Sequence, residues 1–326
     1  MISYKVKSYL RQSEIASNKD VKLNILVMGA THERYEQQLC MTGHNFYSIK
    51  HGKEWNLNYG EIPKNYTLLE YMPYDIHPDL IISHVSGERL DIAIQYANLY
   101  GVKVVRHTHT LPESEQELFY FQSQDNPLVI NTFISEYSKK AWHSQGIVVN
   151  HGLDLDLFKP KQINRELKIL SVVNQWANRD WACGWEIYKN IRSSTNYNYT
   201  VLGDNPGMSE PAASISNLVD SYNAHSVFLN TSMQSPVPMA LLEAMACGCA
   251  VVSTATCMIP EIIKDGYNGF LCSDIDEIKD RLQVLHEDPQ LAIKLGDNAR
   301  KTMVEKFGLE NFCINWNNIF RKVILK

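Results

Sequence analysis

Three residues of the chain combine a reactive type with a position that suits a ligand site. Glu243 lies inside an apolar helical stretch, and His84 and His109 each follow an apolar run typical of a buried strand. A carboxylate in an apolar stretch is costly unless another group pairs with it or hydrogen-bonds to it. Histidine exchanges protons near neutral pH, and the end of a strand favours a site over a place in the core. These residues therefore indicate a polar ligand site at strand and helix ends.

The segment around Glu243 predicts how that carboxylate is positioned. Ser235 is a good N-cap and Pro236 suits the first helical position, so a helix is expected to begin there. Glu243 would then lie about two turns, or ~12 Å, beyond Ser235. A buried strand is expected at residues 249–253, and Pro260 opens another helix. Helix, strand and helix in this order describe half of a doubly wound sheet, whose ligands lie at strand carboxyl ends and whose helix N-termini attract phosphate.

Apolar, strand-like runs alternate with helical stretches along most of the chain, which predicts parallel sheets. In the first half the expected strands are residues 23–29, 79–84, 102–105 and 128–132, with helices at 89–100 and 136–145. In the second half further strands are expected at residues 167–173, 199–203 and 227–230. The predicted fold class is α/β, with two Rossmann-like doubly wound domains.

Length and composition set outer limits on this interpretation. A chain of 326 residues fits two domains of roughly 150 residues each. No apolar run reaches the ~18 to 20 residues of a membrane span, and the charged first 20 residues do not resemble a secretory signal. We therefore expect a cytoplasmic protein, with peripheral attachment to a membrane left open.

The seven scattered cysteines match neither a disulfide framework nor a zinc site. The net charge of −5 argues against a protein that coats nucleic acid nonspecifically.

Four motifs follow one another in the second half: LLEAMACG, AVVST, IPEII and KDGYNG. In this order they resemble the signature region of family 4 retaining glycosyltransferases, the group 1 type with the GT-B fold. The family pattern carries two glutamates eight residues apart, and Glu243 stands at the second, which usually holds the ribose hydroxyls of a nucleotide sugar. Ser235 replaces the first glutamate and Pro236 the glycine after it, so the chain is divergent at that motif.

The resemblance also implies a domain organisation. In a GT-B fold two Rossmann-like domains face a central cleft, here residues 1–155 on the acceptor side and residues 156–326 on the nucleotide-sugar side. The last helix of the family often crosses back to the first domain. Residues 148–160 resemble the crossing between the domains, with His151 in place of the usual Asn.

The donor site is implied by positions that match the family pattern. Where the family carries an Arg and a Lys that contact the donor diphosphate, this chain has Asn174 and Arg179. An arginine suits the role because it is always charged and bonds two phosphate oxygens at once. The donor-binding residues implied by the resemblance are Asn174, Gly203, Ser235, Val237, Pro238, Met239 and Glu243.

The catalytic and acceptor-side residues are implied in the same way. His109 stands where related enzymes carry a histidine that contacts the sugar, so the expected catalytic residues are His109, Arg179 and Glu243. His107 would point to the same face of an extended segment, so the backbone alone does not choose between the two histidines. The expected acceptor-side residues are Thr31, His32, Arg34 and His84.

The reaction implied by the resemblance is transfer of a sugar from a nucleotide-diphosphate donor, expected to be UDP-linked, to a hydroxyl acceptor with retention of configuration. Arg179 and a helix N-terminus would stabilise the departing diphosphate, so neither a metal ion nor another cofactor is expected. Open acceptors are a glycan, a lipid-linked glycan, a protein and a modified DNA base. Two alternatives remain, a virus-like enzyme that modifies a hydroxymethylated DNA base and a catalytically degenerate GT-B protein that binds a nucleotide or glycan.

Overall fold

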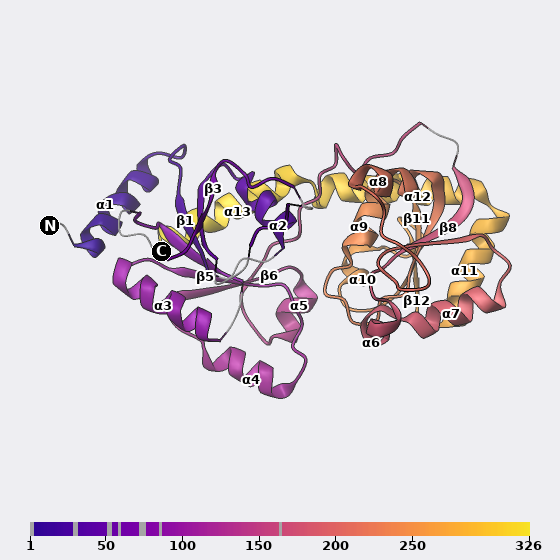
Figure 1. Ribbon diagram of the computed structural model, residues 1–326, viewed down its shortest axis with the longest axis horizontal. Helices are drawn as coiled ribbons and strands as arrows, with labels where there is room; N and C mark the ends of the chain where they lie inside the picture. The colour runs from indigo at the N-terminus through magenta and orange to yellow at the C-terminus, as the bar shows by residue number, and fades with distance from the viewer. Residues whose placement is uncertain are drawn as a thin grey trace. The chain divides into compact units, whose positions relative to one another are not determined.

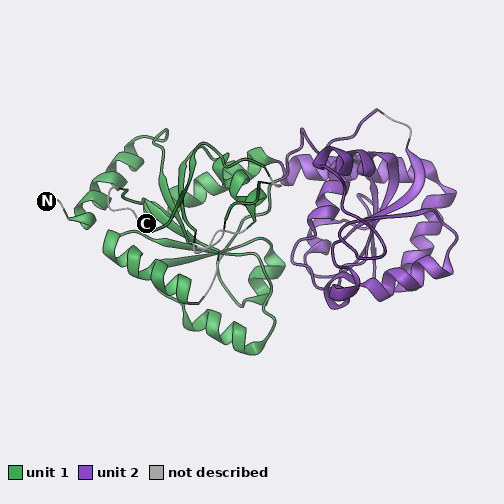
Figure 2. Cartoon of the chain, viewed as in Figure 1, with its two compact units in different colours: residues 1–152, 309–326 green, residues 153–308 purple. Residues whose placement is uncertain are grey.

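The chain folds into two compact units, seen here in a computed structural model that describes residues 3–28, 32–50, 54–57, 60–71, 76–84, 87–162 and 165–326. Unit 1 comprises Met1–Gly152 together with Leu309–Lys326, and unit 2 comprises Leu153–Gly308 (Figure 2). The sequence-based division at residues 155 and 156 lies three residues beyond this boundary. The segment from residue 309 onward belongs to unit 1, so the chain leaves that unit once and returns to it.

Unit 1 is built on a parallel sheet. Its strands within the described residues are β1 (Asn24–Met28), β2 (Asn45–Ile49), β3 (Tyr66–Leu69), β4 (Leu80–Ser83), β5 (Val104–Thr108), β6 (Val129–Phe133) and β7 (Ile147–Val148). Their order is β3-β2-β1-β4-β5-β6-β7. The chain runs outward in one direction from β1 and in the other from β4. Ligands of such sheets bind at the carboxyl ends of the strands that flank this reversal.

Helices cover both faces of the unit 1 sheet (Figure 1). They are α1 (Tyr4–Ser17), α2 (Glu33–Cys40), α3 (Glu88–Tyr100), α4 (Glu115–Ser123), α5 (Glu136–Ala141) and α13 (Leu309–Ile324). Val105 and its neighbours on one face pack against α2 and α13. Val104 and the alternate residues pack against α3 on the other face. This alternation explains why the strands read as continuous apolar runs, since both faces of a parallel sheet are buried.

Unit 2 repeats the architecture with five parallel strands among its described residues. They are β8 (Glu166–Val172), β9 (Tyr199–Leu202), β10 (His225–Asn230), β11 (Ala250–Thr254) and β12 (Phe270–Cys272), in the order β12-β11-β10-β8-β9. The reversal of strand order falls between β8 and β10. The loops that follow these two strands therefore flank the expected ligand position of this unit.

The unit 2 helices also lie on both faces of their sheet. They are η2 (Ala177–Arg179), α6 (Asp180–Cys183), α7 (Trp185–Ser194), α8 (Ile215–Ala224), α9 (Met239–Ala246), α10 (Ile259–Ile262), α11 (Ile275–Glu287) and α12 (Pro289–Lys306). One face packs on α8, α9 and α12, and the other on α7 and α11. The predicted α/β class with parallel sheets is confirmed, and every strand expected from the sequence has an observed counterpart.

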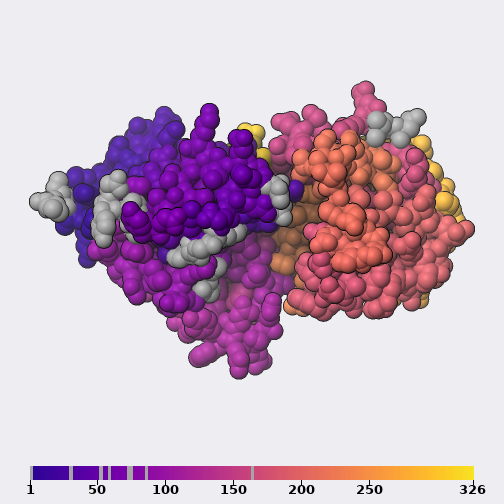
Figure 3. All heavy atoms as spheres, in the orientation of Figure 1, coloured from indigo at the N-terminus to yellow at the C-terminus, as the bar shows by residue number. Residues whose placement is uncertain are grey.

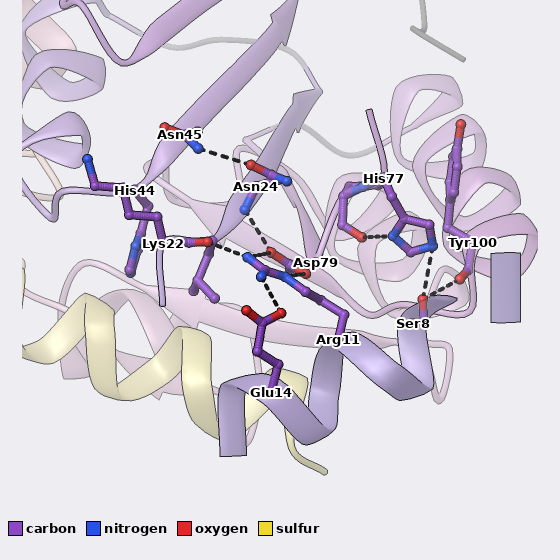
Figure 4. A network of polar contacts seen from close by, with 12 residues as sticks. Ser8, Arg11, Glu14, Lys22, Asn24, His44, Asn45, His77, Asp79 and Tyr100 are labelled. Atoms are coloured by element: carbon purple, nitrogen blue, oxygen red, sulfur yellow. Dashed lines mark hydrogen bonds and ion pairs between the residues drawn. The ribbon is translucent and has the colours of Figure 1, made fainter. Parts of the chain in front are cut away.

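The first helix is joined to the amino edge of the unit 1 sheet by a polar network (Figure 4). Arg11 Nε donates to Asp79 Oδ1 at 3.0 Å, and Asp79 Oδ2 accepts from the amide of Asn24 at 2.8 Å. Ser8 Oγ donates to the carbonyl of Tyr100 at 2.6 Å. Burial raises the pKa of Asp79, against the opposing effects of the Asn24 amide and the Arg11 guanidinium. Helix α1 is thus an integral part of unit 1.

Helix α4 projects at the lower edge of unit 1 in Figure 3 and exposes 73% of Phe119, with Tyr120 exposed beside it. Its first turn is acidic, with Glu115 and Glu117. A lipid acceptor would favour an exposed patch that is both apolar and basic. The exposed side chains of α4 are apolar, but its first turn is acidic rather than basic. No helix within the described ranges is long and apolar enough to cross a membrane.

Candidate functional site

The structure brings His84 and His109 together at the carboxyl edge of the unit 1 sheet. His84 directly follows β4 and His109 directly follows β5, which are neighbouring strands. Their side chains meet, with His84 Nδ1 3.1 Å from His109 Nε2. Because β4 borders the reversal of strand order, both rings lie where a sheet of this topology binds ligands.

His107 occupies a different environment from His109, although both belong to the same segment. His107 is fully buried, its Nδ1 lies 2.8 Å from Thr132 Oγ1, and its Nε2 lies 2.7 Å from the Tyr35 hydroxyl. Both ring nitrogens of His107 are therefore engaged within the core. His109 is less buried, and its Nδ1 has no partner within the described part of the chain. The geometry thus favours His109 as the residue that can contact a ligand.

Tyr35 of α2 lies at the centre of the histidine cluster. Its ring centroid is 4.6 Å from that of His109, 5.5 Å from those of His107 and His151, and 5.8 Å from that of His84. Sequence reasoning missed Tyr35, because nothing near it in the chain indicates that α2 packs over the ends of β4 and β5. It also gave His151 no role in the site, although its place at the domain crossing was noted.

Burial keeps these imidazoles neutral. It lowers the pKa of His84 to about 3 and that of His151 to about 4. Burial also lowers the pKa values of His107 and His109 well below their ordinary value, and the neighbouring imidazoles add to that effect. A neutral imidazole carries one N–H and one lone pair, so each ring in the cluster acts as one donor and one acceptor.

The acceptor-side residues expected after the first strand begin a helix. His32 is the N-cap of α2, where its Nδ1 accepts a hydrogen bond from the amide of Arg34 at 3.3 Å. Both residues belong to the same turn, and α2 continues from them to Tyr35. Thr31 lies outside the described residues.

In unit 2, Glu243 has a specific partner. Its side chain is 5% exposed, and its Oε2 accepts a hydrogen bond from the Tyr222 hydroxyl at 2.8 Å. Burial raises the pKa of Tyr222 well above its usual range, and the Glu243 charge adds to this effect, so the hydroxyl keeps its proton and remains a donor. Tyr222, on α8, was not predicted from the sequence, since it lies 21 residues away from the carboxylate it contacts.

The predicted start of the helix that carries Glu243 is wrong. The helix begins at Met239 with Pro238 as its N-cap, so Ser235 is not a cap and Pro236 is not its first residue. Glu243 is the fifth residue of α9, about 6 Å along the axis from Met239 rather than ~12 Å from a cap at Ser235.

Side chains at the ends of β10 and β11 hold the loop that precedes α9. The hydroxyls of Thr254 and Thr256 both donate to the carbonyl of Ser232, and Asn230 Nδ2 donates to Ser253 Oγ at 2.8 Å. Ser235 and Val237 belong to this loop, directly before Pro238 and Met239. No side chain of the described residues caps the first turn of α9.

The loops after β8 and β9 are joined to each other. Asn174 Oδ1 accepts from the amide of Asp204 at 2.9 Å, and a Cβ on Gly203 would lie 1.9 Å from the carbonyl oxygen of Val173. Gly203 also has φ +131°, which favours glycine. Asn174 and Gly203 therefore come together, at one side of the reversal of strand order. Arg179 follows in η2, with an exposed side chain.

The described residues contain no group of three or more His, Cys, Asp or Glu side chains arranged to hold a metal ion. In unit 1 the histidines meet at the carboxyl edge of the sheet, and His109 offers a neutral imidazole to hydroxyl groups. In unit 2, Arg179 follows β8, and α9, which carries the buried Glu243, follows β10, so the two elements start at the carboxyl ends of neighbouring strands. A carboxylate, a guanidinium and an uncapped helix N-terminus suit a ligand with both hydroxyl groups and an anionic part.

Comparisons with known proteins agree with this geometry. Residues 212–302, which contain Tyr222 and Glu243, match the model of the family described as glycosyl transferases group 1. The chain is 34% identical over 88 residues to N-acetyl-alpha-D-glucosaminyl L-malate synthase of Bacillus anthracis, covering 26% of this chain and 23% of the relative. It is 33% identical over 109 residues to alpha-maltose-1-phosphate synthase of Mycolicibacterium smegmatis, covering 31% and 28%. The chain thus spans about a quarter of the length of these relatives.

Solved structures match over almost the whole chain. HepE of Anabaena, in a complex with UDP, has a TM-score of 0.75 at 15% identity, covering 93% of this chain and 100% of that one. Sucrose-phosphate synthase of Thermosynechococcus elongatus has a TM-score of 0.73 at 16% identity, covering 93% and 99%. Residues 212–302 thus match the glycosyl transferases group 1 family, within a chain whose two units have the GT-B fold.

Proposed function

We propose that this protein is a glycosyltransferase that moves a sugar from a nucleotide-diphosphate donor to a hydroxyl acceptor. In this proposal the transfer retains the anomeric configuration and needs no metal ion, and unit 2 binds the donor. The observation that carries the proposal is Glu243, a nearly buried carboxylate inside the group 1 match and within about a turn of an uncapped helix start. A carboxylate there can accept both hydroxyls of a ribose, while the helix start faces the phosphates.

The diphosphate would be held by backbone and cation together. The first turn of α9 has amide groups that no side chain of the described residues caps, and such a terminus attracts phosphate. Arg179 adds a permanent positive charge from the loop after β8, which borders the reversal of strand order. These groups stabilise negative charge as it develops on the leaving diphosphate, which is the main requirement of the reaction.

The histidine group of unit 1 would bind hydroxyl groups of the transferred sugar or of the acceptor. A neutral imidazole is suited to this task, because its lone pair accepts from a hydroxyl without introducing charge. The proposed catalytic set is therefore His109, Arg179 and Glu243. Asn174 and Gly203 shape the backbone beside the nucleotide.

The test is thermal stabilisation of the protein by a panel of nucleotides and nucleotide sugars. UDP-linked sugars come first, followed by GDP-, ADP-, CMP- and dTDP-linked sugars and the free nucleotides. A ligand at 100 times its dissociation constant should add ~2.7 kcal/mol to the free energy of unfolding. We expect one nucleotide class to stabilise the wild type and to lose this effect in Glu243→Ala.

Glu287→Ala is the matched control, because Glu287 is an exposed glutamate on α11 of the same unit. It should keep the full stabilisation. Release of free sugar from the stabilising donor, with no acceptor added, then tests turnover, which should fall in His109→Ala. Binding without turnover of any donor would instead favour a non-catalytic nucleotide-binding protein. No stabilisation by any member of the panel would overturn the proposal.

A further inference from the structure

Glu36 of α2 brings a carboxylate to the histidine pair at the edge of the unit 1 sheet. Its Oε1 lies 3.5 Å from His84 Nε2, and both side chains are only 1% exposed. On the opposite side of the same ring, His84 Nδ1 lies 3.1 Å from His109 Nε2. A carboxylate, a first imidazole and a second imidazole therefore follow one another from the interior to the edge of the sheet.

The carboxylate decides which nitrogen of His84 carries the proton. A neutral imidazole has one N–H, and burial lowers the pKa of His84 to about 3, so the ring is neutral at pH 7. With Glu36 ionised, its carboxylate only accepts, and a lone pair on Nε2 would face its negative charge. At 3.5 Å the contact is too long for a hydrogen bond, and His84 Nε2 makes none within the described residues, so the attraction is between the carboxylate charge and the N–H dipole of two buried groups. The proton of His84 therefore belongs on Nε2.

The tautomer of His84 determines the tautomer of His109. With its proton on Nε2, His84 offers a lone pair at Nδ1, so His109 must donate from Nε2 across the 3.1 Å contact. His109 then has a bare Nδ1, for which the described residues provide no partner.

We propose that Glu36 and His84 are positioning residues that fix His109 in a single tautomer, with its Nδ1 lone pair presented to a substrate hydroxyl. The described contacts from which the tautomer is argued lie within unit 1. The identity of the hydroxyl as one on the sugar or acceptor rests on the proposed function.

A second set of contacts fixes the tautomer of His107, the other candidate histidine. Thr132 Oγ1 lies 3.4 Å from the carbonyl oxygen of Arg106, to which it donates, so it accepts from Nδ1–H of His107. His107 Nε2 then accepts from the Tyr35 hydroxyl at 2.7 Å. Both ring nitrogens of His107 therefore have partners, so His107 presents no bare nitrogen to a ligand. The contacts from Glu36 through His84 lead instead to His109, whose Nδ1 is bare.

The test is nitrogen NMR of the full-length protein labelled with ¹⁵N-histidine, which distinguishes protonated from bare ring nitrogens. Signals are assigned with His84→Gln and His109→Gln. In the wild type without ligand we expect both rings protonated on Nε2 and bare on Nδ1. In Glu36→Leu both rings should shift toward a mixture of tautomers. Glu33→Leu is the matched control, because Glu33 is a buried glutamate of the same helix whose Oε1 accepts from the Asn56 amide at 3.3 Å.

Two results would overturn the proposed order of donors and acceptors from Glu36 to His109. One is a proton on Nδ1 of His109 in the wild type, as expected if Glu36 were protonated and donated to His84. The other is a folded Glu36→Leu variant whose His84 and His109 signals match those of the wild type. The wild-type spectrum decides the matter even if the variant does not fold.

Activity gives a second readout that separates this proposal from the proposed function. Turnover of the donor should fall about 10- to 100-fold in Glu36→Leu, the size of loss seen when a carboxylate that orients a metal-bound histidine is removed. The KM for the donor, which unit 2 binds, should change less than about twofold. A wild type with the expected tautomers that binds no nucleotide would refute only the proposed function. A wild type that turns over a donor with His109 protonated on Nδ1 would refute only the tautomer proposal.

Discussion

Buried histidines contribute to how unit 1 responds to acid. His84 and His151 have pKa values near 3 and 4 in the folded protein, against an ordinary value of 6.5. Above pH 6.5 these imidazoles are neutral in both the folded and the unfolded chain and do not affect the pH dependence. As the pH falls below 6.5, the unfolded chain binds protons that the folded chain cannot bind, so stability is lost toward pH 4.

The free energy of unfolding should therefore fall from pH 6.5 to pH 4, with each such histidine contributing up to about 1.4 kcal/mol per pH unit. His151→Asn should make this dependence less steep, since it removes one of these groups. Urea unfolding at pH 7, 6 and 5 measures the slope. His286→Gln, on the exposed surface of α11, is the control and should leave the slope as in the wild type. An unchanged slope in His151→Asn would contradict the assignment.

At the scale of the elements, the start of α9 decides what Ser235 does. A serine that caps a helix usually contributes about 1 kcal/mol, and Ser235 lies four residues before Met239, outside the helix. Ser214 does cap a helix, because its Oγ accepts from the amide of Asn217 at 3.1 Å at the start of α8. The two serines therefore form a matched pair in the same unit.

Ser214→Ala should lower the free energy of unfolding by about 1 kcal/mol, whereas Ser235→Ala should change it by less than about 0.5 kcal/mol. Urea unfolding of both variants measures the difference. Equal losses in the two variants would mean that Ser235 stabilises the helix after all. A weaker stabilisation by the donor in Ser235→Ala alone would assign Ser235 to ligand binding.

The elements also show how far the sequence predicts this protein. Apolar runs predicted the central strands, because a strand buried on both faces must be apolar throughout. The start of α9 was misplaced, because Ser235 and Pro236 satisfy the local rule for a helix start, whereas Pro238 disfavours helix at the residue before it and Thr254 and Thr256 bind the preceding loop at the carbonyl of Ser232. The local pattern contains Pro238, but it cannot include the contacts from Thr254 and Thr256.

The same limit applies to the candidate sites. Individual residues such as His84, His109 and Glu243 were predicted from their type, their position and the family resemblance. Their partners Glu36 and Tyr222 come from separate helices, and the tautomer of a histidine depends on those partners. The site therefore becomes defined only when the helices are packed on the sheet.

On the scale of the whole molecule, α13 completes the core of unit 1 after the chain has formed unit 2. Trp316 is fully buried, packs with Phe312 and Phe320, and lies with its ring centroid 5.0 Å from that of His107. The returning helix therefore supports both the core of unit 1 and the histidine group.

Trp316→Ala should destabilise unit 1 by roughly 3–5 kcal/mol, because it leaves a cavity in a packed core. Trp181→Ala is the matched control, because Trp181 is 59% exposed, and it should cost less than about 0.5 kcal/mol. Urea unfolding followed by circular dichroism measures both. Similar costs for the two variants would show that α13 is not an essential part of the unit 1 core.

The return of the chain has a consequence for how the protein is made on the ribosome. Residues 153–308 form a continuous unit and can fold as soon as they have emerged. Unit 1 is begun first but must wait for residues 309–326, which are synthesised after all of unit 2. Domains generally fold in the order of their synthesis, from the N-terminus onward. Here that order is reversed, and the apolar face of β1, β4 and β5 that α13 covers stays open to chaperones throughout translation of unit 2.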